Sequence, residues 1–165
     1  MENVVKNSQD GNIVFIGCVR SFNLISFMGY DLSIEEQDER SLALSEVDLN
    51  KIRLETVLRE GETRITGEEI LERLKAGGNI LLDVGLLKAL WWNKSRIPKS
   101  WKERRLDGNI RYIYFYGTIL RSPGGSRCVP CLYWGVDGRW ECICHRLGYG
   151  YYDDDPSVVL VQSAP

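Results

Sequence analysis

The stretch NIRYIYFYGTILR, residues 109–121, decides how this chain is expected to fold. Its side chains alternate between two faces, with Tyr112, Tyr114 and Tyr116 on one and Arg111, Ile113 and Phe115 on the other. Aromatic and β-branched residues favour extended backbone, and the turn-forming residues 122–125 (Ser-Pro-Gly-Gly) follow at once. The stretch therefore predicts a strand over about 110–121.

Two further strands follow this one. Residues 122–125 and 135–138 are both rich in glycine, which predicts turns that connect strands at about 126–134 and 139–147. The expected result is a three-stranded antiparallel β-meander. A short apolar run from Val158 to Val161 predicts a closing strand.

Upstream of the meander, local signals predict helices. Thr66 and Glu69 have the spacing of a capping box, and Gly77-Gly78 end the helix that they begin. Asp83 is a good N-cap for a second helix, which runs to about Asn93. Residues 12–19 and 80–82 are apolar and predict strands.

Two segments are less distinctive. Residues 48–60 favour a third helix, although apolar residues also alternate there as in a strand. Residues 33–40 are acidic and predict a solvated surface loop. The fold class that results is α+β, with an N-terminal strand and two or three helices packed on the C-terminal antiparallel β-meander. Residues 1–165 are expected to form one domain, with 1–108 and 109–165 as possible subdomains.

Composition limits the function classes. The chain has 165 residues, of which 44% are hydrophobic and 27% charged, as in an ordinary globular protein. A net charge of -2 gives no positive field for a phosphate backbone, so nucleic-acid binding is disfavoured. No stretch approaches the roughly 20 apolar residues of a membrane helix. The expectation is a cytoplasmic protein with no membrane partner and reduced cysteines.

One group of residues has the chemistry of a zinc site. The group offers thiolates and an imidazole on two strands expected to be neighbours, and it consists of Cys128, Cys131, Cys142, Cys144 and His145. Strand alternation places Cys142 and Cys144 on the same face and His145 on the other, so small buried hydrophobic cysteines are the favoured interpretation. No cofactor is expected.

Other reactive patterns are weaker. A thiolate–imidazolium pair for nucleophilic catalysis would need His145, the sole histidine, to meet a cysteine that faces away from it, so an enzyme is disfavoured. The acidic run 153–155 offers oxygens to a hard cation such as Ca²⁺, or forms a solvated turn. The basic run 99–105 is interpreted as a solvated connector.

Tyrosine is concentrated near the C-terminal end of the sequence. Residues 148–153 mix tyrosine, glycine and aspartate, as the binding loops of antibodies do. We expect a ligand-binding patch in which the loop after Leu147 folds back along the sheet, formed by Trp140, Tyr149, Tyr151, Tyr152 and Asp153. Burial of the same rings in a core is the structural alternative.

Several motifs resemble those of a family of small uncharacterised bacterial proteins. They are Ile97-Pro-Lys-Ser-Trp-Lys102, Tyr116-Gly-Thr-Ile-Leu-Arg121 and Leu132-Tyr-Trp134, and the resemblance covers roughly residues 40–161. It implies no activity. The segment 138–155 is also similar in style to the variable segments of C-type-lectin-like target proteins of diversity-generating retroelements, which implies a recognition surface tolerant of side-chain exchange.

Three functional hypotheses follow. The first is a non-catalytic recognition protein that binds a protein or a small polar ligand through the aromatic loop. The second is a metal-dependent protein or enzyme that uses the cysteine cluster or the aspartate run. The third is a structural protein whose partner covers the sheet.

Overall fold

The computed structural model describes residues 11–29 and 31–162. Its α-helices are α1 (Glu39–Leu42), α2 (Gly67–Ala76) and α3 (Val84–Trp92). Its strands are β1 (Ile13–Phe15), β2 (Ser33–Gln37), β3 (Glu46–Asp48), β4 (Ile52–Glu55), β5 (Arg64–Thr66), β6 (Ile80–Leu81), β7 (Tyr112–Tyr114), β8 (Thr118–Arg121), β9 (Arg127–Trp134), β10 (Trp140–Arg146), β11 (Gly150–Tyr152) and β12 (Ser157–Leu160).

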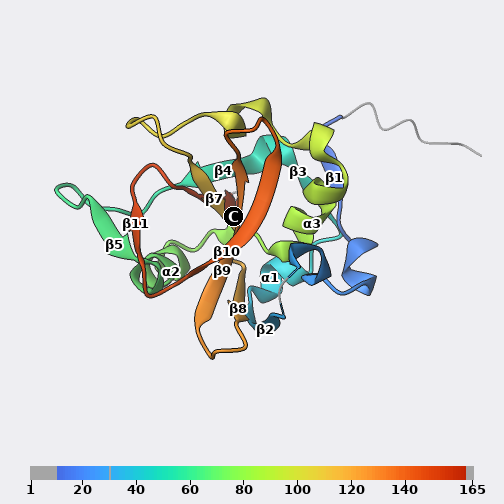
Figure 1. Ribbon diagram of the computed structural model, residues 1–165. Helices are drawn as coiled ribbons and strands as arrows, with labels where there is room; N and C mark the ends of the chain where they lie inside the picture. The colour runs from blue at the N-terminus through green and yellow to red at the C-terminus, as the bar shows by residue number, and fades with distance from the viewer. Residues whose placement is uncertain (1–10, 30, 163–165) are drawn as a thin grey trace, which may run out of the picture.

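A mixed sheet of 8 strands lies at the centre of the molecule (Figure 1). The strand order is β2-β8-β9-β7-β12-β4, with β10 paired to β9 and β6 paired to β12. Among the pairings of this sheet within the described residues, only β12–β7 is parallel. The sheet is thus larger than a three-stranded meander, and β12 lies inside it instead of closing it.

Side-chain alternation gives the sheet two apolar faces. Ile113, Leu132 and Val158 point into one core, which α3 covers. The adjacent residues of the same strands point into a second core, which α2 covers. Figure 1 shows α3 and α2 on opposite sides of β9 and β10. The expected α+β class is confirmed, with strands predominating.

Local capping explains where α2 and α3 begin. The Thr66 hydroxyl accepts from the Glu69 amide at 3.2 Å, as the capping box predicts, although the Glu69 carboxylate binds Arg73 instead of returning to the cap. The Asp83 carboxylate accepts from the Gly85 amide at 2.9 Å. Both predicted helices are confirmed.

The expected helix over 48–60 is wrong. This segment contains the end of β3, a single 3-10 turn and β4. Pairing with β12 supplies β4 with hydrogen bonds that an isolated segment would seek in a helix, which is why the strand alternation wins.

The long strand expected at 110–121 is split into β7 and β8 by a bend at 115–117. Gly117 lies against the backbone of β6, and a Cβ atom there would come within 2.2 Å of the Leu81 carbonyl oxygen. The Gly117 amide donates to the Leu82 carbonyl at 3.0 Å. Glycine is required at this close approach of two backbones.

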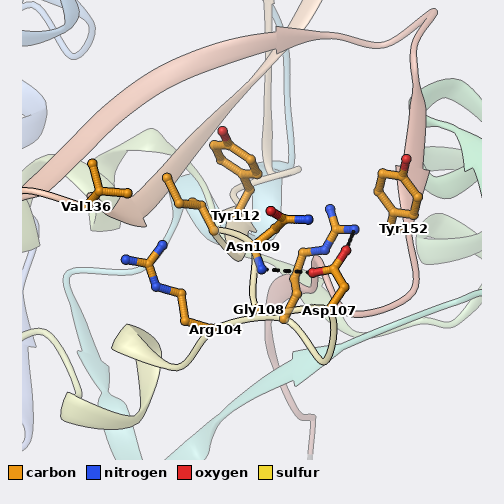
Figure 2. Close-up of a pocket in the computed structure, with 9 residues that line it drawn as sticks. Arg104, Asp107, Gly108, Asn109, Tyr112, Val136 and Tyr152 are labelled. Atoms are coloured by element: carbon orange, nitrogen blue, oxygen red, sulfur yellow. Dashed lines mark hydrogen bonds and ion pairs between the residues drawn. The ribbon is translucent and has the colours of Figure 1, made fainter.

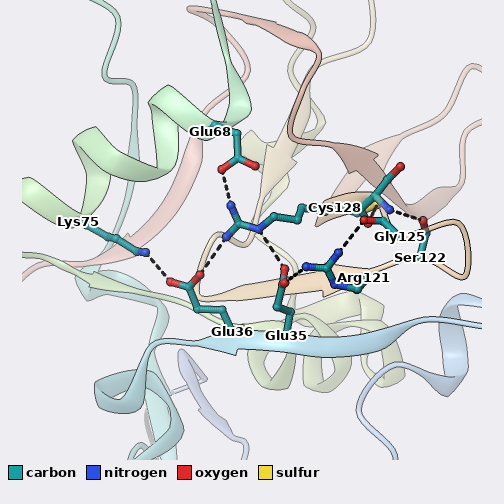
Figure 3. Close-up of polar contacts among 10 residues, drawn as sticks. Glu35, Glu36, Glu68, Lys75, Arg121, Ser122, Gly125 and Cys128 are labelled. Atoms are coloured by element: carbon teal, nitrogen blue, oxygen red, sulfur yellow. Dashed lines mark hydrogen bonds and ion pairs between the residues drawn. The ribbon is translucent and has the colours of Figure 1, made fainter.

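The acidic segment expected as a loop is strand β2, and its carboxylates are paired (Figure 3). Arg127 contacts Glu35 and Glu36 at 3.0 Å each and also Glu68 of α2, while Arg121 binds Glu35. The strand pairs with β8, and the partners of its carboxylates also lie far away in the sequence, so local composition did not reveal it.

Both halves of the chain contribute strands to the central sheet. β4 and β6 pair with β12, and β2 pairs with β8, so a division at residue 108 would separate paired strands. Among the helices of the part that the structure describes, none combines the length and apolarity required to cross a membrane.

Candidate functional site

Strand β11 divides the C-terminal tyrosines between the core and the surface. It pairs with β5, so that Tyr151 lies opposite Ile65 and Tyr152 opposite Arg64. Tyr151 is only 3% exposed, and its hydroxyl donates to the Arg146 carbonyl at 2.8 Å. Tyr149 and Tyr152 are 57% and 40% exposed. Only these two of the three predicted tyrosines are available at the surface.

Trp140 does not belong with them. It is 7% exposed, packs against Trp134 with ring centroids 5.1 Å apart, and belongs to the core under α3, whereas Tyr151 belongs to the core under α2. The expectation of one patch formed by Trp140 and the tyrosines is therefore wrong, because Trp140 of the central sheet packs under α3, whereas β11 pairs with β5 in a separate two-stranded sheet beside the core under α2.

Arg105 connects the exposed tyrosine to the acidic run. Its guanidinium lies over the Tyr152 ring at 4.0 Å and contacts Asp107 at 2.6 Å and both Asp154 and Asp155 at 3.4 Å. The Arg105 side chain is only 11% exposed, so this end of the basic run is not a solvated connector. Asp153, another predicted ligand-binding residue, is exposed.

The aspartate run holds a neighbouring loop instead of standing free. Asp154 accepts from the Leu106 amide and Asp155 from the Tyr112 amide, each at 2.9 Å. Burial raises the pKa of Asp155 to about 6, against the lowering effect of the Tyr112 amide and of Arg105. These contacts fold the segment that carries Arg105 and Asp107 onto β11.

His145 forms the inner wall of the same region. The Tyr114 hydroxyl lies 2.8 Å from His145 Nδ1, and the Tyr112 ring packs edge-on with its centroid 4.6 Å from that of the imidazole. Burial lowers the pKa of His145, so the ring is neutral at pH 7. His145 thus lies among tyrosines, on the face of the sheet opposite to that of Cys142 and Cys144, with which it was grouped.

Two adjoining hollows lie around these residues, and together we call them the tyrosine cleft. The larger, about 510 Å³, is bounded by the loop of residues 104–110 (Figure 2), and the smaller, about 260 Å³, reaches His145. They share Arg105, Tyr112 and Tyr152. The cleft is lined, among others, by Arg64, Arg104, Arg105, Asp107, Tyr112, Tyr114, His145, Tyr149, Tyr151, Tyr152 and Asp155.

The candidate metal ligands do not converge. Cys142 and Cys144 pack in the core under α3, whereas Cys131 packs under α2 and His145 faces the tyrosines of that side. Within residues 11–29 and 31–162, no three histidine, cysteine or acidic side chains are grouped as a metal ion would require. Burial raises the pKa of Cys142 and of Cys144 to about 12, which disfavours thiolates.

Comparison with protein-family models, curated proteins and solved structures finds no match for this chain. The two resemblances drawn from the sequence motifs therefore stay predictions, and the cleft itself must carry the functional argument.

Sequence reasoning found the tyrosines and the histidine but missed the arginines of the cleft. Arg64 and Arg105 enter it from segments that are remote from β11 in sequence. One signal was present: the basic run 99–105 and the acidic run 153–155 have complementary charges, which could have suggested that they meet.

Proposed function

We propose that this protein is a non-catalytic recognition protein and that the tyrosine cleft binds a small polar ligand. The observation that carries the proposal is the position of Tyr152, a 40% exposed ring that the guanidinium groups of Arg105 and Arg64 approach to 4.0 and 5.4 Å from its centroid. A large exposed ring fixed by charged neighbours has already lost its rotamer freedom, so a ligand need not order it.

The shape of the cleft favours a small ligand over a flat protein surface. Hollows of about 510 and 260 Å³ have the size of ordinary small-molecule sites, and aromatic walls with a few polar groups are their usual lining. The pKa of Asp155 and that of His145 are both shifted by burial, which is typical of functional clefts. Binding of a ligand does not require Asp155 or His145 to act as an acid or a base.

A fragment screen tests the proposal. The full chain, labelled with ¹⁵N, would be exposed to a set of small polar compounds while amide shifts are followed by NMR. We expect the compounds that bind to shift the amide signals of residues 105–112 and 149–155. The Tyr152→Ala variant should bind the same compounds more weakly. Phe22→Ala, which removes an exposed ring outside the cleft, is the matched control. Binding concentrated elsewhere, or equal effects of the two variants, would contradict the proposal.

A further inference from the structure

The arginines around the tyrosine cleft differ in how their charge is used. Arg105 is shared among Asp107, Asp154 and Asp155. Arg64, Arg104 and Arg146 are exposed, and none of them has a carboxylate partner in the part of the chain that the structure describes. Arg64 and Arg146 contact tyrosine rings instead, Tyr152 at 5.4 Å and Tyr149 at 5.9 Å. Positive charge is therefore available at the cleft although the protein is acidic.

Arg64 is held in place by its neighbour across the strand pair. A Cβ atom at Gly150 would come within 2.2 Å of Arg64 Nε and 2.8 Å of Cγ and Cδ, so the arginine side chain lies directly over this glycine. Arg64 also lies opposite Tyr152 in the β5–β11 register. The bare backbone of Gly150 and the Tyr152 ring together position the guanidinium at the mouth of the smaller hollow.

His145 adds a hydrogen-bond donor. Burial raises the pKa of Tyr114, so its hydroxyl stays protonated, and His145 Nδ1 is the one partner that this hydroxyl has among the residues described. The tautomer that lets this hydroxyl donate its proton has Nδ1 as the acceptor and the proton of the neutral imidazole on Nε2. His145 lines the smaller hollow, so the Nε2–H of this tautomer can serve as a donor to a ligand there.

The acceptors of the cleft, in contrast, are already used. Asp155 accepts from the Tyr112 amide and from Arg105, Asp154 from the Leu106 amide, and Asp107 from the Asn109 amide and Arg105. A ligand that enters the cleft finds unpaired donors and few free acceptors. Guanidinium groups favour carboxylate and phosphate oxygens, which accept hydrogen bonds in a geometry that matches their N–H groups.

We infer that the ligand of the tyrosine cleft is a small organic anion, with a carboxylate or phosphate group that the Arg64 guanidinium and the His145 Nε2–H bind while its remaining part contacts the exposed tyrosine rings. This inference rests on the proposed function, since it names the ligand class of the same cleft. Gly150 is a positioning residue in this arrangement, because it acts only through Arg64.

Three probes with a common ring and different charge test the inference on the full chain. They are phenyl phosphate, phenyl β-D-glucoside and phenyltrimethylammonium, each titrated at pH 7.5 by calorimetry and followed by amide shifts. Phenyl phosphate is expected to bind roughly tenfold more tightly than the glucoside, since a charge-assisted hydrogen bond replaces a neutral one. The ammonium probe is expected to bind most weakly.

Variants separate a specific site from general attraction of charge. Arg64→Gln should weaken phenyl phosphate binding roughly five- to tenfold, whereas Arg53→Gln, which removes an exposed arginine on β4, should change it less than about twofold. Gly150→Ala, which keeps every charge but displaces Arg64, should weaken it as well, and His145→Leu should remove the second donor. Dispersed amide spectra confirm that each variant is folded.

The outcomes discriminate between the two proposals. Equal affinity for phosphate and glucoside at the cleft, or a preference for the ammonium probe, would overturn the anion class and leave the recognition function in place. Equal effects of Arg64→Gln and Arg53→Gln would also overturn it. If no probe shifts the cleft amides, the anion class fails, and the fragment screen decides the fate of the recognition function separately.

Discussion

Two arginine–aspartate clusters in this protein use the same chemistry at opposite faces of the sheet. At the start of α3, Arg20 binds the single carboxylate of Asp83 at 2.8 and 3.2 Å, and Asp83 is wholly buried. At the tyrosine cleft, Arg105 is divided among Asp107, Asp154 and Asp155, with contacts to the last two of 3.4 Å.

The difference lies in the length of the contacts and in their burial. Asp83 also caps α3 through the Gly85 amide, and Arg20 also donates to the Ser41 carbonyl at 2.7 Å, so short contacts hold the pair, although the buried Arg20 Nε has no hydrogen-bond partner among the residues described. The Arg105 cluster has one short contact, to Asp107, and two long ones, and it lies beside open cavities. We therefore expect the first cluster to stabilise the fold more than the second does.

The largest effect is expected when the closed cluster is broken. Asp83→Ala removes the helix cap and leaves the charge of Arg20 without its carboxylate, which should lower the free energy of unfolding by about 3–5 kcal/mol. Denaturant titration measures it. Asp154→Ala, the matched change in the open cluster, should cost less than about 1 kcal/mol. Similar losses for both variants would remove the distinction between the clusters.

A smaller effect is expected at the centre of the open cluster. Arg105→Gln leaves Asp155 with only the Tyr112 amide as partner, and we expect it to lower the free energy of unfolding by about 1–2 kcal/mol. The same denaturant titration applies. A loss as large as that of Asp83→Ala would mean that the Arg105 cluster is part of the structural core.

The pH dependence of stability isolates Asp155. Its pKa in the folded protein, about 6, lies above the ordinary value of 3.8, so its contribution is fully present below pH 3.8 and is lost as pH rises through 6. Asp155→Asn cannot ionise and keeps an acceptor for the Tyr112 amide. The variant should gain stability relative to the native protein between pH 4 and 7, on the order of 1 kcal/mol. A constant difference over this range would contradict the raised pKa.

The smallest effect is expected at the exposed ring. Tyr152→Ala removes a 40% exposed side chain whose main contacts are with Arg64 and Arg105, so the free energy of unfolding should fall by less than about 1 kcal/mol. A thermal melt is sufficient to measure it. A loss of several kcal/mol would assign Tyr152 to the core and leave the cleft without its anchor.

Local signals in the sequence predicted the local parts of the fold. The caps at Thr66 and Asp83 and the alternation at 112–116 depend only on neighbouring residues, and they correctly located α2, α3 and the two faces of β7. The segments that were misjudged, β2 and β4, take their conformation from strands far along the chain. Charge in β2 suggested solvent because its arginine partners lie in β8 and β9.

The sequence predicted several residues of the candidate site but not how the fold brings them together. Tyr149, Tyr152 and Asp153 are exposed on or beside β11, yet whether successive tyrosines face solvent or core depends on the pairing of β11 with β5, which no local pattern encodes. Arg64 and Arg105 were not predicted for the same reason. The candidate metal ligands lie apart because alternation along β9 and β10 places Cys142 and Cys144 on one face of the sheet and Cys131 and His145 on the other.

The position of β12 has a consequence for how the chain is made in the cell. This strand is the last of the sheet in chain order, yet it lies inside the sheet, with β4 on one edge and β7 and β6 on the other. During vectorial synthesis on the ribosome, residues 31–156 emerge before the strand that joins them, so the edges of β4, β6 and β7 stay unpaired until translation has passed Leu160. Such edges invite aggregation. Nascent chains of this protein are therefore expected to depend on chaperones that bind them until the sheet closes.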